Sequence, residues 1–409
     1  MIELMVAITL SALLILGLVQ VFSASRSSYL TAQGMARTQE NGRFAIDYLQ
    51  RDARLAGHMG CVNDQSHFLS SRPTVGELFL SNRDDYSTVP AVTNGAALRF
   101  DYSIQGYEAV GSAPGQALSV LTVPAIGAAT DWAPALPAIL QIPASSPRPV
   151  KGSDILFLRM LSPESTVLKS FSPIAGTSDV TLQVDGNEWP DLKQNSVTPG
   201  LFALSDCRMT TLFQASAITE PGGKNDVTVS VLTGSGKSSI NQSGFTAYDA
   251  FDPALAQTRL YRADIIAYYV GFNTTTQSPS LYRMSFTSAI NGAQIARNFE
   301  EVVPGVENMQ LLYGQDSSVG SSTVERPTGF INTQVTAQDI KPNNTSRDGW
   351  QRVGSIKVGL MVRSPDPAVA QLRDAMPYVL GTQVTYADDK RYRTVYETNI
   401  AVRNRLFGN

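Results

Sequence analysis

Residues 1–30 read MIELMVAITLSALLILGLVQVFSASRSSYL, and this stretch decides how the rest of the chain is organised. Residues 4–22 contain no charged residue and no proline. Because an α-helix rises about 1.5 Å per residue, this segment would cover about 28 Å, close to the hydrocarbon thickness of a bilayer. The stretch therefore predicts a helix that can span a membrane.

Two features set this segment apart from an ordinary signal anchor, which is the alternative interpretation. A single carboxylate, Glu3, stands at the head of the apolar run, where it needs a cationic partner or a place at the lipid interface. Helix-compatible sequence also continues to Gly57, so one helix of about 55 residues would reach about 80 Å. A cleaved signal peptide is disfavoured, because no basic segment or small-x-small cleavage site is present.

The N-terminal residues also resemble a known family. Residues 2–14, IELMVAITLSALL, resemble the class III signal of type IV pilins, in which one Glu lies near the start of a short hydrophobic segment. Residues 34–61, GMARTQENGRFAIDYLQRDARLAGHMGC, resemble more narrowly the PilW family of minor pilins. Further agreement with that family follows in order at residues 150–154, 205–207, 268–269, 281–283, 305–307, 313–314 and 391–405.

The resemblance implies a route of assembly. Prepilin peptidase would cleave before the hydrophobic segment, the new first residue would be N-methylated, and Glu3 would pair with the N-terminal amine of a neighbouring subunit. The family usually has two more residues before this Glu and a leader ending in Gly, so Met1 is not expected to be the mature end. Gly17 would loosen the helix or allow close packing, or is a tolerated helix glycine. The expected assembly residues are Glu3, Leu4, Ile8, Leu13, Leu16, Gly17 and Phe22.

Charge and cysteine content narrow the class of protein. Charged residues make up 16% of the chain and the net charge is −3, so no basic field favours nucleic acid. Cys61 and Cys207 are the only cysteines. An even count in an exported chain suggests a disulfide, and the cysteines of the PilW family match these positions. Such a bond would constrain the unfolded chain by about 4–5 kcal/mol; two buried free thiols are the alternative.

The second half of the helix, residues 26–57, shows a partial apolar face. Residues 34–43 are polar and include Gly34 and Gly42, so this part is expected to lie against the head or neighbouring subunits. Gly57 and Gly60 are expected to end the helix. The residues expected to face the head are Phe44, Ala45, Tyr48, Leu49, Leu55 and Ala56.

The remainder of the chain predicts a β-rich head. Residues 62–150 are rich in Ser, Pro, Gly and Ala and are interpreted as an inserted, variable region with an occasional strand, as at 97–102. Short helices are expected at 253–260 and 367–375. Strands, mainly antiparallel, are predicted at 154–159, 201–204, 227–231, 265–270, 280–284, 309–313, 355–363 and 393–402.

No residue pattern points to an enzyme. The only histidines are His58 and His67, and neither belongs to a recognisable zinc or Ser/His/Asp arrangement. Residues 232–239, LTGSGKSS, end like a phosphate-binding loop but lack its first glycine and its strand-loop-helix context. We therefore expect no catalytic residues, no metal and no cofactor.

These observations predict an α+β pilin fold. The N-terminal helix would occupy residues 1–57, with 1–25 as the membrane or filament-core half and 26–57 as the amphipathic half, and the head would occupy 58–409. By resemblance, the chain is a PilW-like minor pilin near the tip of a type IV pilus. It would lie in the inner membrane before assembly and then in an extracellular filament, with other pilin subunits and the pilus assembly machinery as partners. The alternatives are the repeating subunit of its own filament, a J-type pseudopilin of type II secretion, and an adhesin whose binding site lies in residues 62–150.

Overall fold

The structure is a computed structural model of the 409-residue chain. Of residues 62–63, 75–78, 95–96 and 346–348 only the backbone is described. The structure describes residues 1–60, 62–63, 75–78, 95–100, 103–173, 179–193, 199–206, 210–232, 241, 257–292, 295–316, 329–340, 346–368 and 375–402.

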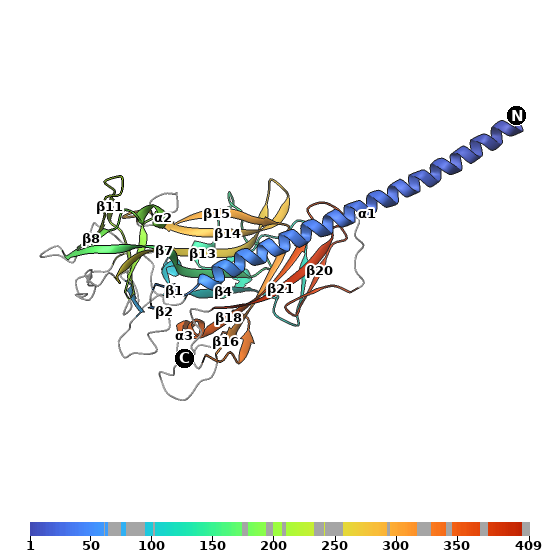
Figure 1. Cartoon of the computed structure of the whole chain (residues 1–409). Helices are drawn as coiled ribbons and strands as arrows, with labels where there is room; N and C mark the ends of the chain where they lie inside the picture. Colours follow the sequence, from blue (N-terminus) through green and yellow to red (C-terminus); the bar gives the residue numbers. More distant parts are fainter. Residues whose placement is uncertain are drawn as a thin grey trace.

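A single long helix, α1 (Ile2–Leu55), begins the chain and projects far beyond the β-rich head (Figure 1). The helix stops where Gly57 and Gly60 adopt positive φ angles of 79° and 78°. Glycine reaches these angles without the steric cost that a Cβ atom would add, so the expected glycine stop is confirmed.

The largest sheet is built around two long antiparallel strands, β7 (Ile155–Pro173) and β13 (Arg259–Asn273). Its other strands are β3 (Val75–Leu78), β4 (Ile104–Ala109), β6 (Trp132–Ala133), β8 (Val180–Val184), β9 (Leu201–Ser205), β10 (Thr210–Gln214), β11 (Ala217–Thr219), β12 (Val227–Val231), β14 (Ser278–Ser288) and β15 (Ile295–Pro304). β13 pairs first with β9 and then with β14, while β7 pairs first with β4 and then with β8. The β7–β13 pair therefore joins the two ends of the head.

Smaller sheets and short helices complete the head. A four-stranded sheet has the order β17 (Thr333–Val335), β16 (Val306–Gln315), β18 (Val353–Arg363) and β21 (Arg393–Ala401). A three-stranded sheet joins β19 (Tyr378–Val379), β20 (Thr382–Tyr386) and β5 (Ala117–Val120), and β1 (His58–Met59) pairs with β2 (Val62–Asn63). The short helices are α2 (Trp189–Lys193), α3 (Ser346–Gln351) and the 3-10 turns η2 (Gly95–Leu98), η3 (Ala129–Asp131) and η4 (Ala138–Leu140).

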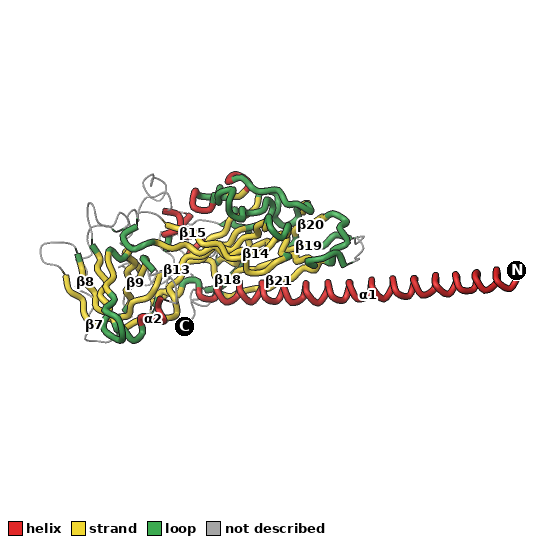
Figure 2. The backbone as a smooth tube through the Cα atoms, turned by 90° about the horizontal axis from the view of Figure 1, so that it is seen from above, coloured by secondary structure: helices red, strands yellow, loops and turns green. Residues whose placement is uncertain are grey.

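The second half of α1 docks on the head along a stripe of mostly small residues, beside β18 and β21 (Figure 2). The buried residues of the helix are Gly34, Thr38, Gly42, Ala45, Leu49, Asp52 and Ala53. A Cβ atom on Gly42 would lie 2.3 Å from the ring of Tyr396, and one on Gly34 would lie 2.6 Å from Ala368 Cβ. The two glycines therefore let the helix backbone touch the head.

The helix face differs in part from the face that the sequence predicted. Ala45, Leu49 and Ala56 are fully buried, as expected. The expectation for Phe44 and Tyr48 is wrong, because these side chains are 50% and 36% exposed. A step of one residue turns a helix by about 100°, which rotates each ring away from its buried neighbour.

The predicted strands are largely confirmed and the predicted short helices are not. Residues 227–231 form β12 as expected, but β3–β10 and β5–β20 are parallel pairs in a mainly antiparallel fold. The prediction of a strand at 97–102 is wrong at its start, because residues 97–98 belong to η2. Residues 101–102 lie outside the described residues. The helix expected at 253–260 is wrong at its end, which belongs to β13, and residues 253–256 are not described. In the range 367–375, the residues that are described are not helical.

A buried carboxylate holds the C-terminal end of α1. Asp52 is 4% exposed, and its Oδ2 atom accepts hydrogen bonds from Tyr268 Oη at 2.7 Å and from Arg283 Nε at 2.9 Å. Arg51 Nε donates to the other oxygen, Oδ1, at 3.0 Å. Because Tyr268 lies on β13 and Arg283 on β14, Asp52 ties the helix to the middle of the large sheet.

Two buried carboxyl groups that contact each other, Glu108 and Asp154, link β4, the start of β7 and β16. The Asp154 carboxylate accepts backbone N–H groups from Ala109 and Leu311, each at 2.8 Å. Burial, the charge of Asp154 and the hydrogen bond with it raise the pKa of Glu108 to about 9. Burial also raises the pKa of Asp154, to about 7, and the protonated Glu108 donates a hydrogen bond to Asp154 at neutral pH.

We predict that Asp52→Ala lowers the free energy of unfolding by about 3 kcal/mol, because Arg283 and Tyr268 lose a buried charged partner. Thermal unfolding of the full chain in detergent would measure the change. Asp47→Ala is the matched control, since Asp47 is exposed and its loss should change stability by no more than about 0.5 kcal/mol. Equal effects of the two substitutions would contradict an anchoring role for Asp52.

We predict that Glu108→Gln flattens the dependence of stability on pH. The folded-state pKa of Glu108 lies above its ordinary value, so its stabilising contribution is complete below about pH 4.5 and is lost as the pH rises towards 9. Between pH 5 and pH 8 the loss of stability should be larger in the wild type than in the variant, which retains only the raised pKa of Asp154, by on the order of 3 kcal/mol. Chemical denaturation at both pH values tests this, with the exposed Glu40→Gln as control, and an unchanged slope for Glu108→Gln would refute it.

Candidate assembly site on the N-terminal helix

The first half of α1 is an exposed apolar rod, which we define as residues 1–26. Every residue in it is exposed, including Leu4 at 68% and Phe22 at 78%. An 18-residue window of α1 has a mean hydropathy of 2.5 and none of that window is buried. This is the helix in the described structure that is long and apolar enough to cross a membrane.

The few polar groups in the rod are compatible with an apolar environment. Thr9 Oγ1 donates to the backbone oxygen of Met5 at 3.0 Å, and Ser11 Oγ donates to that of Ala7 at 2.8 Å. These hydroxyls therefore remain hydrogen-bonded whether the rod lies in lipid or packs against protein. A Cβ atom on Gly17 would meet no heavy atom within 4 Å, so no contact in the described part of the chain requires a glycine there.

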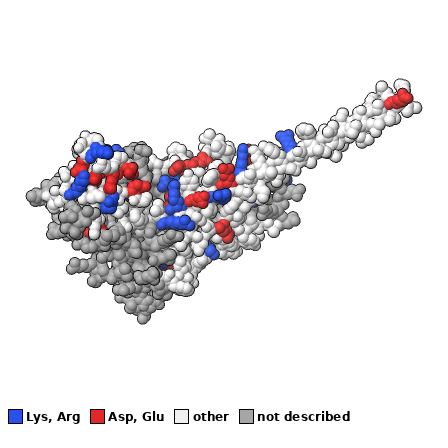
Figure 3. All heavy atoms as spheres, viewed as in Figure 1, with Lys and Arg blue, Asp and Glu red and all other residues white. Residues whose placement is uncertain are grey.

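The structure places all seven expected assembly residues on this rod. Glu3 and Arg26 are the only charged side chains in the sequence of the rod. The rest of the rod surface that is visible in Figure 3 is uncharged. Glu3 lies in the first helical turn and forms no ion pair with another described residue. Because no described residue pairs with it, we expect this carboxylate to meet a cationic partner on another molecule or to lie at the lipid interface.

Just after the rod ends, α1 contacts a loop of the head. This loop consists of residues 364–368, and we call it the collar. Thr31 Oγ1 donates a hydrogen bond to the backbone oxygen of Ala368 at 2.8 Å. Arg37 forms an ion pair with Asp366 at 3.3 Å. One helical turn further on, Asn41 Nδ2 donates to the Pro304 oxygen at 3.0 Å, so three successive turns of α1 are held.

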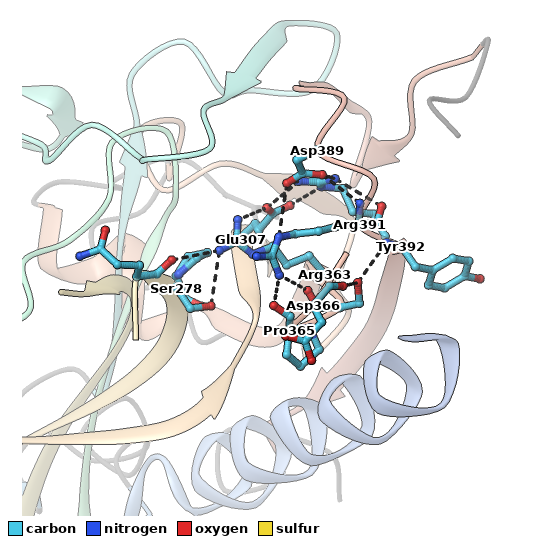
Figure 4. Close-up of polar contacts among 12 residues, drawn as sticks. Ser278, Glu307, Arg363, Pro365, Asp366, Asp389, Arg391 and Tyr392 are labelled. Atoms are coloured by element: carbon cyan, nitrogen blue, oxygen red, sulfur yellow. Dashed lines mark hydrogen bonds and ion pairs between the residues drawn. The ribbon is translucent and has the colours of Figure 1, made fainter. Parts of the chain in front are cut away.

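A buried ionic network supports the collar (Figure 4). Arg393 donates to both carboxylate oxygens of Glu307, at 2.7 and 3.0 Å, and also to both oxygens of Asp389, at 2.6 and 2.8 Å. Arg363 forms a second ion pair with Glu307 at 3.1 Å. Glu307, Arg363 and Arg393 are each at most 5% exposed, so their charges offset one another away from water. Arg391, which is more exposed, adds a further cation 3.6 Å from Asp389.

The network also fixes the loop that leads into β21. Burial raises the pKa of Asp389, but the hydrogen bonds from Arg393 and from the Arg391 backbone outweigh it and hold that pKa below its usual value. Arg391 donates from its side chain to the backbone oxygens of Ser364 and Pro365. Residues 389–393 and the collar are thereby held together beside α1.

Sequence reasoning missed this network. Residues 305–307 and 391–405 carried only a family resemblance. A weak signal was present, because Glu307 is the one charged residue in the sequence of β16 and Arg363 ends the mostly apolar β18. A charge inside such a strand needs a buried partner. The identity of that partner depends on strand pairing, which the sequence does not reveal.

The other sites considered in the sequence, the cysteine pair and the phosphate-loop-like segment, lie almost entirely outside the described residues. Cys61 and Cys207, and residues 233–239 of the rejected phosphate loop, are not described. Among the described side chains, no group of three His, Cys, Asp or Glu could hold a metal ion. A cleft of about 480 Å³ between α2, β13 and β14 contains Arg262 and Arg283, which pair with Asp264 and Asp52.

Comparison with known proteins bears on the C-terminal third of the chain. No curated protein and no solved structure matches the sequence. A family model described as PilW, type IV pilus-assembly protein W, matches residues 267–404. The matched segment runs from β13 through β21 and contains Arg283, the collar and all four members of the ionic network. Residues 267–404 are therefore similar to the PilW family of type IV pilus-assembly proteins.

Proposed function

We propose that this chain is a structural subunit of a type IV pilus or a pilus-like filament and that it polymerises through the apolar rod. The observation that carries the proposal is the complete exposure of residues 1–26, in a helix whose later turns are hydrogen-bonded to the head. An apolar surface of this length is unstable in water. Lipid would cover it before assembly, and the helices of other subunits would cover it afterwards.

In this proposal the head and the rod form a pilin fold with separate tasks. The inner membrane holds the rod of the processed chain, and the assembly machinery moves it into an extracellular filament. Glu3 then pairs with the N-terminal amine of a neighbouring subunit, which sets the register between helices as well as adding attraction. The family match at residues 267–404 supports a role in pilus assembly.

A minor, tip-located subunit that helps to initiate assembly is the leading form of the proposal. The repeating subunit of its own filament and a J-type pseudopilin would use the same rod. An adhesin would need a surface-binding module in residues 62–150. The described part of that region supplies core residues, including Trp132, Ile139 and Leu140, so deleting the region would damage the head rather than test binding.

We predict that Glu3→Ala reduces incorporation into surface filaments at least about tenfold, because the partner amine would be left unpaired in apolar surroundings. Immunoblotting of sheared filaments measures incorporation, and thermal unfolding should show an unchanged head. Asp191→Ala is the control for loss of an exposed helix carboxylate, because Asp191 lies on α2 of the head. Filaments with normal amounts of the Glu3→Ala protein would overturn the assembly role of Glu3.

We predict that this protein is a trace component beside an abundant smaller pilin in purified filaments. A subunit that initiates assembly is needed once per filament, whereas a building block is present in every repeat. Quantitative mass spectrometry of sheared filaments, together with negative-stain imaging, gives the ratio. If the chain is instead the dominant protein, it is the building block itself and the minor-subunit form of the proposal is wrong.

A further inference from the structure

The docked half of α1 has a second face, which points away from the head. This outer ridge consists of Glu40, Arg43, Phe44, Asp47, Tyr48 and Arg51, all of which are exposed. At about 100° per residue, its members lie on the side of the helix opposite the buried stripe. The exposed Phe44 and Tyr48 side chains therefore belong to this ridge and not to the head.

Charges on the outer ridge alternate in sign along the helix. Glu40, Arg43, Asp47 and Arg51 follow one another as acid, base, acid and base (Figure 3 shows charges of both signs along this half). Arg51 bonds to Asp52 and lies over the Tyr48 ring, with 5.2 Å between its guanidinium carbon and the ring centroid. Glu40, Arg43 and Asp47 form no ion pair with any residue that the structure describes.

The outer ridge continues the surface of the apolar rod. Exposed or half-exposed residues recur at alternating spacings of four and three residues, the spacing by which parallel helices pack side by side. This line of residues is Phe22, Arg26, Tyr29, Gln33, Ala36, Glu40, Arg43 and Asp47. A helix that packs along the rod can therefore continue along the ridge without changing sides.

We propose that the outer ridge binds the charged second half of the N-terminal helix of a neighbouring pilin subunit. The inference rests on the proposed function and names the segment of the partner that meets this surface. The partner helix lies parallel and places acidic groups beside Arg43 and Arg51 and a basic group beside Asp47. The apolar rod of a neighbour does not fit this surface, because it would remove water from Glu40, Arg43 and Asp47 without supplying a charged or hydrogen-bonding partner.

The alternation also determines how far neighbouring helices are displaced along their axes. Where the neighbour is a second copy of this chain, two ridges side by side without displacement would place like charges together. A displacement of three or four residues, about 5 Å, brings Arg43 of one helix beside Glu40 or Asp47 of the next. The ridge thus selects a stagger, whereas the uncharged part of the rod permits many.

Site-specific photocrosslinking in cells that assemble filaments tests the proposal. Phe44 is replaced with p-benzoyl-phenylalanine in the full chain, and crosslinked peptides are mapped by mass spectrometry. Leu14 on the rod and Phe330 on the head, which is 71% exposed, are the matched positions. We expect Phe44 to crosslink to residues that follow the apolar segment of a pilin-type partner, with a yield at least about tenfold above that of Phe330.

The other outcomes separate this inference from the proposed function. Crosslinks from Leu14 but none from Phe44, or crosslinks from Phe44 to the apolar segment of the partner, would overturn the inference alone. Absence of pilin crosslinks from both positions would overturn the proposed function as well.

A charge reversal tests the recognition itself. Arg43→Glu turns the series into acid, acid, acid and base, so the crosslink yield from Phe44 should fall about tenfold while that from Leu14 persists. Arg43→Lys keeps the charge and should retain the yield. The unfolding temperature should not change in either variant, because Arg43 is exposed on the side of α1 away from the head. An unchanged yield in Arg43→Glu would overturn recognition by charge.

Discussion

Close contact between the backbone of α1 and the head is the constraint on which the rest of the structure depends. Gly42 lies against the Tyr396 ring and Gly34 against Ala368, so the helix sits at a distance that a larger side chain would not allow. Isolated helices gain little stability in water, and most of their stability in proteins comes from packing. The docked half therefore holds the free rod in line, and the direction of the rod follows from the fit of two glycines.

The buried charges around α1 are better explained by positioning than by stability. A buried ion pair rarely stabilises a fold more than apolar residues of the same shape would, because both charges lose their water. The network of Glu307, Arg363, Arg393 and Asp389, however, admits few alternative arrangements, since Arg393 uses both edges of its guanidinium group. It fixes the collar at the end of the rod, as Asp52 fixes the other end of the docked half.

The sequence predicted the elements whose signal is local. An uncharged run at residues 4–22 and glycines at 57 and 60 were enough to place the helix, and β-branched runs bounded by turn residues placed β12 and β18. The error at Phe44 and Tyr48 arose because large apolar side chains were assumed to be buried, whereas close docking required Gly42 and Ala45. The ionic network joins residues from 307 to 393, and its partners depend on long-range strand pairing that no local pattern encodes.

One helix thus presents three surfaces with different chemistry, and their separation matters for assembly. The buried stripe is used within the molecule, whereas the rod and the outer ridge make few contacts with the described part of the head. Folding of the head consequently does not depend on whether the rod lies in lipid or in a filament. A subunit that must leave one apolar environment for another needs this independence, because a head whose stability relied on the rod would be destabilised at each transfer. The docking stripe would provide that independence in the proposed assembly, since it stabilises the helix from the side opposite the outer ridge.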